Sequence, residues 1–402
     1  MLPVILVAYI LAFLDRINVG YTQLQMKEDL GFSDAVYGLG AGIFFLTYLL
    51  FEVPSNLWME KIGARLTFLR IMVLWGLCSA ATMFVSEAWH FYTIRLLLGI
   101  FEAGFFPGVI LYLTYWYPSH RRGRVTALFL LGVPVTGIIG GPISGMIMNG
   151  MDGVNGWSGW QWVFLLEGLP TVLVGVIVYL LLANRPAEAN WLSTSEKALV
   201  QTVMDADHRS HPPSTHHGKL RAALADPRTF VLAFIYFCCA CAIYSFTFWL
   251  PTMIKELGVA SLSTIGWYTV VPYLFAALGV LGIGWSSDHF RERRWHVAVS
   301  LIVGSVALYL TTYLGHAFWP TMALLCLAAF FIFGSVVFWS IPPTYLSREA
   351  AATGIAVISA LGILGGFVSP SIIGYVKTLT GSLAGGLAFM TGIIVVGGIV
   401  TL

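Results

Sequence analysis

The sequence predicts an all-α membrane protein with twelve transmembrane helices, arranged as two pseudo-symmetric six-helix bundles. Three observations carry this prediction: 58% of the 402 residues are hydrophobic, only 10% are charged, and 42 are glycine. A soluble domain has about 25% charged residues, so the composition excludes a soluble enzyme, a nucleic-acid-binding protein and a disordered chain. Glycine at this frequency is typical of membrane helices, where small residues let backbones approach closely.

Twelve apolar runs are long enough to cross a bilayer, which takes about 20 residues of helix. In the first half of the chain they are 2–21, 36–57, 67–86, 91–117, 125–149 and 161–183. In the second half they are 229–251, 264–286, 296–315, 319–342, 352–376 and 384–402. The loops between the runs are short, except for one long polar segment in the middle of the chain.

That polar segment, residues 184–228, divides the chain into an N-terminal bundle, 1–183, and a C-terminal bundle, 229–402. We expect a cytoplasmic linker with a short amphipathic helix, because Ser193 and Glu196 have the spacing of a capping box. The four linker histidines are interpreted as part of a solvated loop, and the five cysteines as packing residues, since neither set has metal-ligand spacing. No metal and no cofactor are therefore expected.

The distribution of Lys and Arg predicts the orientation in the membrane. If the loops are assigned to alternate sides, the side with the termini and the linker receives sixteen of the 21 basic residues. The far side receives only Lys27, Lys255 and Lys377. Because positively charged loops stay in the cytoplasm, both termini and the linker are expected on the cytoplasmic side.

The charged residues that lie well inside the predicted spans, away from the span ends, are confined to the first half of the chain. They are Asp15 and Arg16 in the first span, Glu52 in the second, Arg95 and Glu102 in the fourth and Glu167 in the sixth. A charge at the centre of a bilayer costs at least about 2.5–3.5 kcal/mol, so such groups persist where they are paired, face a cavity and are used. The alternative is an ion-pair network that only locks helices together, but buried pairs add little net stability.

These charges predict a site for an anion and a proton. Arg95, and with it Arg16, would attract a carboxylate, because a guanidinium keeps its proton and matches a carboxylate in shape. Asp15 and Glu102 are the expected proton carriers, since ionised acids neutralise the arginines and protonated acids free them. Proton and substrate then favour each other's binding, which is symport expressed as electrostatics.

Two loops indicate an internal repeat. The loop after the second span contains Glu60, Gly63 and Arg65, and the loop after the eighth contains Asp288 and Arg291. Each loop places an acid at the cytoplasmic end of the second helix of its half, followed by basic residues. We therefore expect two related halves, with a gating or conformational role for Glu60, Arg65 and Asp288.

Both loops resemble degenerate copies of the signature loop of the major facilitator superfamily, G-x-x-x-D-R-x-G-R-R. Residues 95–99 and 137–145 resemble its R-x-x-x-G and Gly-Pro motifs, and residues 13–18 and 95–107 are similar to its anion:cation symporter family. The resemblance covers essentially the whole chain. It implies a proton-coupled carrier of organic anions in a bacterial inner membrane, working by alternating access as a monomer. The resemblance also implies the roles of anion binding for Arg16 and Arg95 and of proton transfer for Asp15 and Glu102, because these four positions match the family's motifs.

Other residues are candidates for the cavity wall and for the moving parts. Tyr48 in the second span could donate its hydroxyl to the substrate, and it matches a substrate-contacting tyrosine in the galactonate branch of that family. Tyr236 and Tyr244 share a face of the seventh span and are expected at the wall, where packing alone is the alternative. Gly141 and Pro142 lie in a segment that should let the fifth span bend as the halves move.

The expected substrate rests on the resemblance. Residues 14–56 resemble the tartrate-transporter branch, which favours a C4 hydroxydicarboxylate such as tartrate, with an aromatic acid such as hydroxyphenylacetate next. An anion exchanger and a uniporter are alternatives within transport. A channel is disfavoured because two related halves suit a carrier, and a membrane enzyme because no H-E-x-x-H or G-x-S-x-G motif is present. The expected partners are the organic carboxylate, protons and the lipid bilayer, without nucleic acid.

Overall fold

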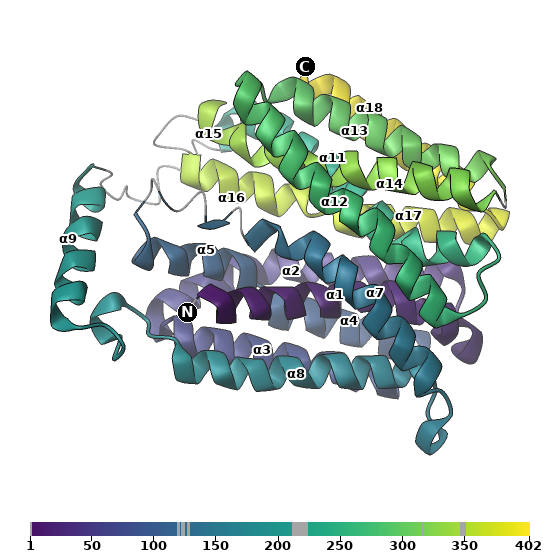
Figure 1. The fold of residues 1–402 in the computed structure, drawn as a ribbon, viewed down its shortest axis with the longest axis horizontal. Coiled ribbons are helices and arrows are strands. Elements are labelled where there is room, and N and C mark those ends of the chain that lie inside the picture. The colour runs from purple at the N-terminus through teal and green to yellow at the C-terminus, as the bar shows by residue number, and fades with distance from the viewer. Residues whose placement is uncertain are drawn as a thin grey trace.

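The computed structural model describes residues 2–118, 121, 125–126, 129–210, 224–315, 317–345 and 351–402, and over these residues it contains helices and turns but no β-strand. The predicted all-helical membrane fold is confirmed (Figure 1). Among the described residues, eleven helices are long and apolar enough to cross a membrane by length and composition. The fifth predicted span is helical as well, but it is rich in glycine, which adds no apolar side chain, and it is not among the eleven.

The helices follow the predicted order. The N-terminal half contains α1 (Leu2–Leu30), α2 (Asp34–Ile62), α3 (Ala64–Ala81), α4 (Ala88–Glu102), α5 (Phe105–Trp116), α7 (Gly132–Gly150) and α8 (Gly159–Leu181). The linker contains α9 (Thr194–Ser210). The C-terminal half contains α11 (Pro227–Glu256), α12 (Leu262–Phe290), α13 (Arg294–Leu310), α14 (Phe318–Gly334), α15 (Pro342–Tyr345), α16 (Ala351–Gly362), α17 (Gly365–Thr380) and α18 (Ala384–Thr401). Short 3-10 turns are η1 (Thr82–Phe84), η2 (Val154–Gly156), η3 (Pro186–Glu188), η4 (Thr311–Tyr313) and η5 (Ser335–Ser340).

The fourth predicted span is not one continuous helix. α4 ends at Glu102, Gly104 adopts a left-handed backbone with φ 88°, and α5 begins at the next residue. A side chain at Gly104 would be strained in this conformation and would also meet Ser55 of α2, 2.6 Å away. Glu102 consequently lies in the last turn of α4, where the helix dipole favours a positive charge beside it.

The two halves meet from the middle of the molecule to the end opposite α9, which we call the far end; the end that carries α9 is the linker end (Figure 1). Three helix pairs form this contact: α1 with α11, α2 with α17, and α7 with α12. Glycines make it close. A Cβ on Gly38 would lie 2.2 Å from the Pro370 carbonyl oxygen, and one on Gly266 would lie 2.1 Å from that of Gly141. Gly141 and the neighbouring Pro142 therefore lie in the contact between the halves.

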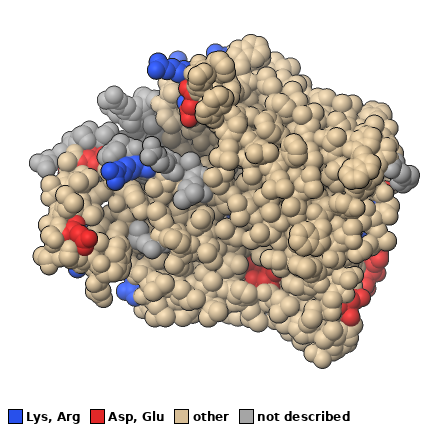
Figure 2. Space-filling model, in the orientation of Figure 1, with Lys and Arg blue, Asp and Glu red and all other residues tan. Residues whose placement is uncertain are grey.

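Lys27, Lys255 and Lys377 each form an ion pair with an acidic residue at the far end. Lys255 of α11 lies 2.7 Å from Glu28 of α1, and Lys377 of α17 lies 3.8 Å from Asp34 of α2. Asp34 also binds Lys27. Two of these three pairs join the halves, so ion pairs add to the glycine contacts that close this end. On the face drawn in Figure 2, most of the visible Lys and Arg side chains lie toward the linker end.

The linker helix α9 begins as predicted. The Ser193 backbone N–H donates to the Glu196 carboxylate at 2.8 Å, and the Glu196 backbone N–H donates to the Ser193 hydroxyl at 3.3 Å, which completes the capping box. The bonds from the Ser193 backbone and hydroxyl hold the pKa of Glu196 below its ordinary value. The linker histidines His211, His216 and His217 lie outside the described residues.

Candidate functional site

Arg16, at the middle of α1, is the centre of the candidate site. Its guanidinium binds the carboxylate of Glu102 from α4 and donates a hydrogen bond of 3.3 Å to the hydroxyl of Tyr244 from α11. The side chain of Glu102 is 1% exposed and that of Arg16 is 13% exposed, so the ion pair is largely shielded from water. Two helices of the N-terminal half and one of the C-terminal half thus meet at a single guanidinium.

Aromatic rings surround this guanidinium. The ring centroids of Phe44, Tyr48, Phe13 and Phe45 lie 5.1, 5.4, 5.7 and 5.9 Å from its central carbon. The Phe45 ring lies 4.4 Å from that of Tyr244, so the aromatic wall continues from α2 across to α11. Ring faces at these distances attract a cation, and they stabilise the charge of Arg16 without occupying its N–H groups.

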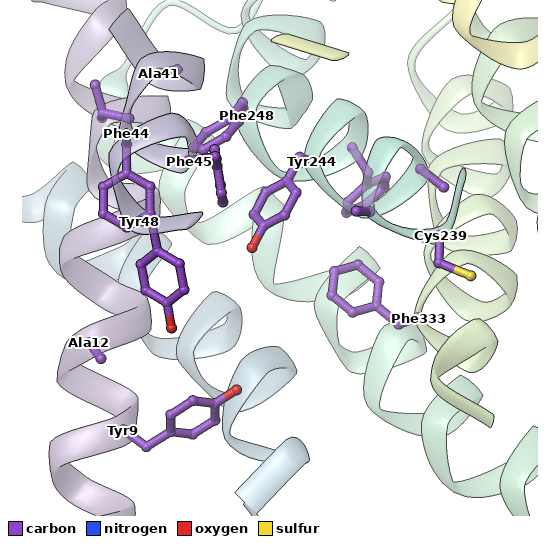
Figure 3. Packing of buried hydrophobic residues seen from close by; sticks show 14 of the residues in the cluster. Tyr9, Ala12, Ala41, Phe44, Phe45, Tyr48, Cys239, Tyr244, Phe248 and Phe333 are labelled. Atoms are coloured by element: carbon purple, nitrogen blue, oxygen red, sulfur yellow. The ribbon is translucent and has the colours of Figure 1, made fainter. Parts of the chain in front are cut away.

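Three tyrosine hydroxyls point toward one region beside these rings. Figure 3 shows the hydroxyls of Tyr9, Tyr48 and Tyr244 directed toward the same space between α1, α2 and α11. Tyr48 and Tyr244 were expected from the sequence, whereas Tyr9 was not. Tyr9 precedes Arg16 by seven residues, which is two helical turns, so its position on the same helix face could have been recognised. The hydroxyls provide hydrogen-bonding groups on an otherwise apolar wall.

The ion pair itself has unused hydrogen-bonding capacity. Both Oε2 of Glu102 and Nε of Arg16 are buried and have no protein hydrogen-bond partner. Leaving a buried polar atom unpaired costs about 1–3 kcal/mol. A site that retains such atoms next to three hydroxyls is suited to a small polar or anionic ligand that supplies the missing partners.

Arg95 is buried against the backbone of α2. Its guanidinium donates to the carbonyl oxygens of Gly40 at 3.1 Å and Ala41 at 3.2 Å. Its central carbon also lies 5.2 Å from the Phe44 ring, the same ring that contacts Arg16. The structure therefore places the charge of Arg95 near the site, with its N–H groups directed at the backbone.

Asp15 faces the interior of the N-terminal half. Neighbouring residues on a helix point about 100° apart, and Asp15 is turned toward α3 and α8. Its carboxylate accepts hydrogen bonds from Trp75 Nε1 at 2.8 Å, Ser79 Oγ at 2.8 Å and Thr171 Oγ1 at 2.9 Å. Asp15 therefore joins α1 to α3 and α8 through three hydrogen bonds.

Two further candidates lie between the ion pair and the linker end. Glu52 of α2 is half-buried and lies close enough to Arg16 to interact with its charge. Tyr236 of α11 stacks on Phe338 at 5.6 Å and lies 4.5 Å from Trp339, so its ring packs within the C-terminal half.

The expected conformational residues are distributed over the two loops. Arg65 donates from its guanidinium to the carbonyl oxygen of Tyr179 at 2.9 Å and from its backbone to Asn184 at 3.0 Å, which ties α3 to the end of α8. Asp288 pairs with Arg293 across its own loop, and Glu60 is exposed. Within the described residues, no group of three or more His, Cys, Asp or Glu side chains could hold a metal ion.

Comparison with known proteins identifies the family. A family model described as Major Facilitator Superfamily matches residues 5–370. The chain is 46% identical to "Putative metabolite transport protein NicT" of Pseudomonas putida, over 95% of this chain and 87% of the relative. It is 44% identical to "Putative tartrate transporter" of Agrobacterium vitis, over 100% of this chain and 92% of the relative.

The fold is also that of a solved transporter. The crystal structure of a bacterial homologue of the human lysosomal transporter Spinster, in an inward-facing and occupied conformation, superposes with a TM-score of 0.79 at 17% identity. The superposition covers 100% of this chain and 95% of the chain in that crystal structure. Together with the full-length relatives, this shows that the chain belongs to the Major Facilitator Superfamily and is a membrane transporter rather than an enzyme.

Proposed function

We propose that this transporter is a proton-coupled symporter of a small organic carboxylate, which works by alternating access. The observation that carries the proposal is the shielded ion pair of Arg16 and Glu102, bound by Tyr244 from the other half. In the proposal, bundles 1–183 and 229–402 rock about this site as units, and residues 184–228 link them.

The coupling follows from competition for one guanidinium. When Glu102 is ionised, it occupies Arg16 and repels an incoming anion. Protonation removes that charge and frees the N–H groups of Arg16, which can then bind a carboxylate with charge-assisted hydrogen bonds. Because the substrate replaces the carboxylate of Glu102, proton and substrate binding favour each other to the same extent.

Other residues have supporting roles in the proposal. The hydroxyls of Tyr9, Tyr48 and Tyr244 hold the polar part of the substrate. Tyr236, whose ring packs against Phe338 and Trp339, forms the wall farther toward the linker end. Arg95 raises the positive potential from behind Phe44. Asp15, which accepts hydrogen bonds from three donors inside the N-terminal half, is the second proton carrier in the proposal.

Alternating access is supported by where the halves touch. Glycine contacts and ion pairs close the far end. We propose that substrate and proton exchange with the linker end in this conformation, and that the linker end faces the cytoplasm of a bacterial cell, where its basic loops would stay. Glu60, Arg65 and Asp288 would then hold the loops that rearrange when the linker end closes.

Two substrate classes are compatible with one guanidinium that is released from its carboxylate partner. A hydroxydicarboxylate is supported by the name of a relative at 44% identity. An aromatic acid is supported by the geometry, since four rings lie within 6 Å of Arg16 and a planar substrate could stack on them. We therefore propose tartrate and hydroxyphenylacetate as the first compounds to test.

The test is uptake of each labelled acid into proteoliposomes with an imposed inward proton gradient. The wild type should accumulate substrate. Glu102→Gln should lose accumulation driven by the gradient but still exchange substrate across the membrane, whereas the exposed control Glu87→Gln should behave like the wild type. Uptake that does not depend on the proton gradient would overturn symport, in favour of exchange if it requires substrate inside the vesicles and of uniport if it only equilibrates the substrate.

A further inference from the structure

A second polar cluster lies in the N-terminal half, away from the ion pair of Arg16. It forms where the antiparallel helices α1 and α8 contact each other. One level of this contact joins Asp15 to Thr171 by a hydrogen bond of 2.9 Å. One turn toward the far end, Asn18 of α1 lies beside the carboxyl of Glu167 of α8, and Ser144 of α7 donates to Glu167 Oε1 at 2.7 Å.

The level of Asn18 and Glu167 contains polar atoms without hydrogen-bond partners, unlike the level of Asp15 and Thr171. Oε2 of Glu167 has no protein hydrogen-bond partner, and neither the nitrogen nor the oxygen of the Asn18 side chain has one. Both side chains are buried, with Glu167 3% and Asn18 0% exposed. Two of these atoms, Oε2 of Glu167 and the Asn18 side-chain oxygen, are acceptors without a partner, so a ligand that both oxygens can bind would be stabilised here.

The charge at this cluster indicates the sign of the ligand. The carboxyl group of Asp15, one helical turn away, accepts hydrogen bonds from Trp75, Ser79 and Thr171. Its carboxylate lies close enough to Glu167 to repel a second negative charge. Among the described residues, Glu102 is paired with Arg16, whereas the side chain that donates to Glu167 is the neutral Ser144. A buried carboxylate without compensation is costly.

We propose that Glu167 and Asn18 form a second cation site, separate from the Arg16–Glu102 pair, which binds a proton or a sodium ion. As a proton site, Glu167 carries the proton on Oε2 and donates it in a hydrogen bond to the carbonyl of Asn18. As a sodium site, Oε2 of Glu167 and the carbonyl oxygen of Asn18 are ligands, since oxygen donors suit hard cations. Asp15 strengthens either one through its charge. The site is on the same helix as Arg16, so cation binding here can influence the substrate site.

Two measurements on the purified transporter, without substrate or transport, test the proposal and distinguish the two cations. The first is the infrared C=O band of a protonated carboxylic acid, taken as the difference between wild type and Glu167→Gln near neutral pH. The second is the thermal unfolding midpoint in sodium chloride compared with choline chloride. Glutamine keeps the size of Glu167 and can still accept from Ser144.

A Glu167 band that persists in sodium chloride supports a proton site. A sodium-specific rise of the unfolding midpoint by at least about 2 °C, lost in Glu167→Gln, supports a sodium site. The absence of both in the wild type would overturn the proposal. Asn18→Asp should strengthen cation binding and Asn18→Leu should weaken it, which keeps the test valid if Glu167→Gln does not fold. Glu102→Gln should retain whichever of the two signals the wild type gives, so a failure of this proposal is distinguishable from a failure of proton-coupled symport.

Discussion

The two halves of the transporter share helix packing but differ in their buried polar groups. Within the described residues, the buried polar side chains of the C-terminal half are all Ser or Thr. Those of the N-terminal half include Asp15, Arg95, Glu102, Glu167, Asn18 and Gln23. The two halves therefore have similar folds but different buried polar residues.

The difference extends to what the polar groups bind. In the C-terminal half, Ser305 donates to a carbonyl oxygen of its own helix, and Ser335 donates to one in α14, the helix that ends just before it, each at 2.6 Å. Such bonds satisfy a hydroxyl without linking helices. In the N-terminal half, Asp15 and Glu102 bind groups of other helices. We infer that the N-terminal half binds the ions, while the C-terminal half supplies the opposite wall, with Tyr244, and the surface that moves.

The largest expected effect is the loss of Arg16. Truncating one member of a buried charge pair costs about 2–5 kcal/mol, so Arg16→Gln should reduce proton-driven uptake by on the order of 100-fold. The matched control is Arg294→Gln in the C-terminal half, whose guanidinium donates to the Thr401 carbonyl oxygen, and its uptake should stay within about twofold of the wild type. Similar losses in both variants would contradict the division of labour between the halves.

A smaller effect is expected from the C-terminal wall. Tyr244→Phe removes the hydroxyl that lies 3.3 Å from the Arg16 guanidinium. A hydrogen bond to a charged group contributes about 1.5–3 kcal/mol, so the KM for substrate should rise by about tenfold. The neighbouring Ser245 is buried too, but its hydroxyl has no protein partner, so Ser245→Ala should leave KM nearly unchanged. An unchanged KM in Tyr244→Phe would confine substrate binding to the N-terminal half.

The smallest effect is expected where the halves meet at the far end. Lys255→Gln removes an ion pair of 2.7 Å between α11 and α1. Partly exposed ion pairs contribute about 0.2–1 kcal/mol. The equilibrium between the conformations with the far end closed and open should therefore shift toward the open one by up to about fivefold. Labelling of a cysteine introduced at the far end would measure this, and high salt should reduce the difference because it screens the pair. Lys61→Gln, at the linker end, should not increase the labelling.

The membrane fold and the half that carries the charges can both be predicted from the sequence alone. Apolar runs and isolated ionisable residues are local properties of a chain, and the cost of placing a charge in a bilayer applies whatever the neighbouring helices are. Arg16 and Glu102 could be named as site candidates for this reason.

Only the tertiary structure decided which partner each charge has. Arg16 binds Tyr244, 228 residues away, while the adjacent Asp15 binds α3 and α8, and Arg95 turns to the backbone of α2. The break at Gly104, which places Glu102 at the end of α4, also depends on the approach of α2. Each of these contacts depends on the rotation and relative height of helices far apart in the chain, and helical periodicity specifies only the faces of one helix.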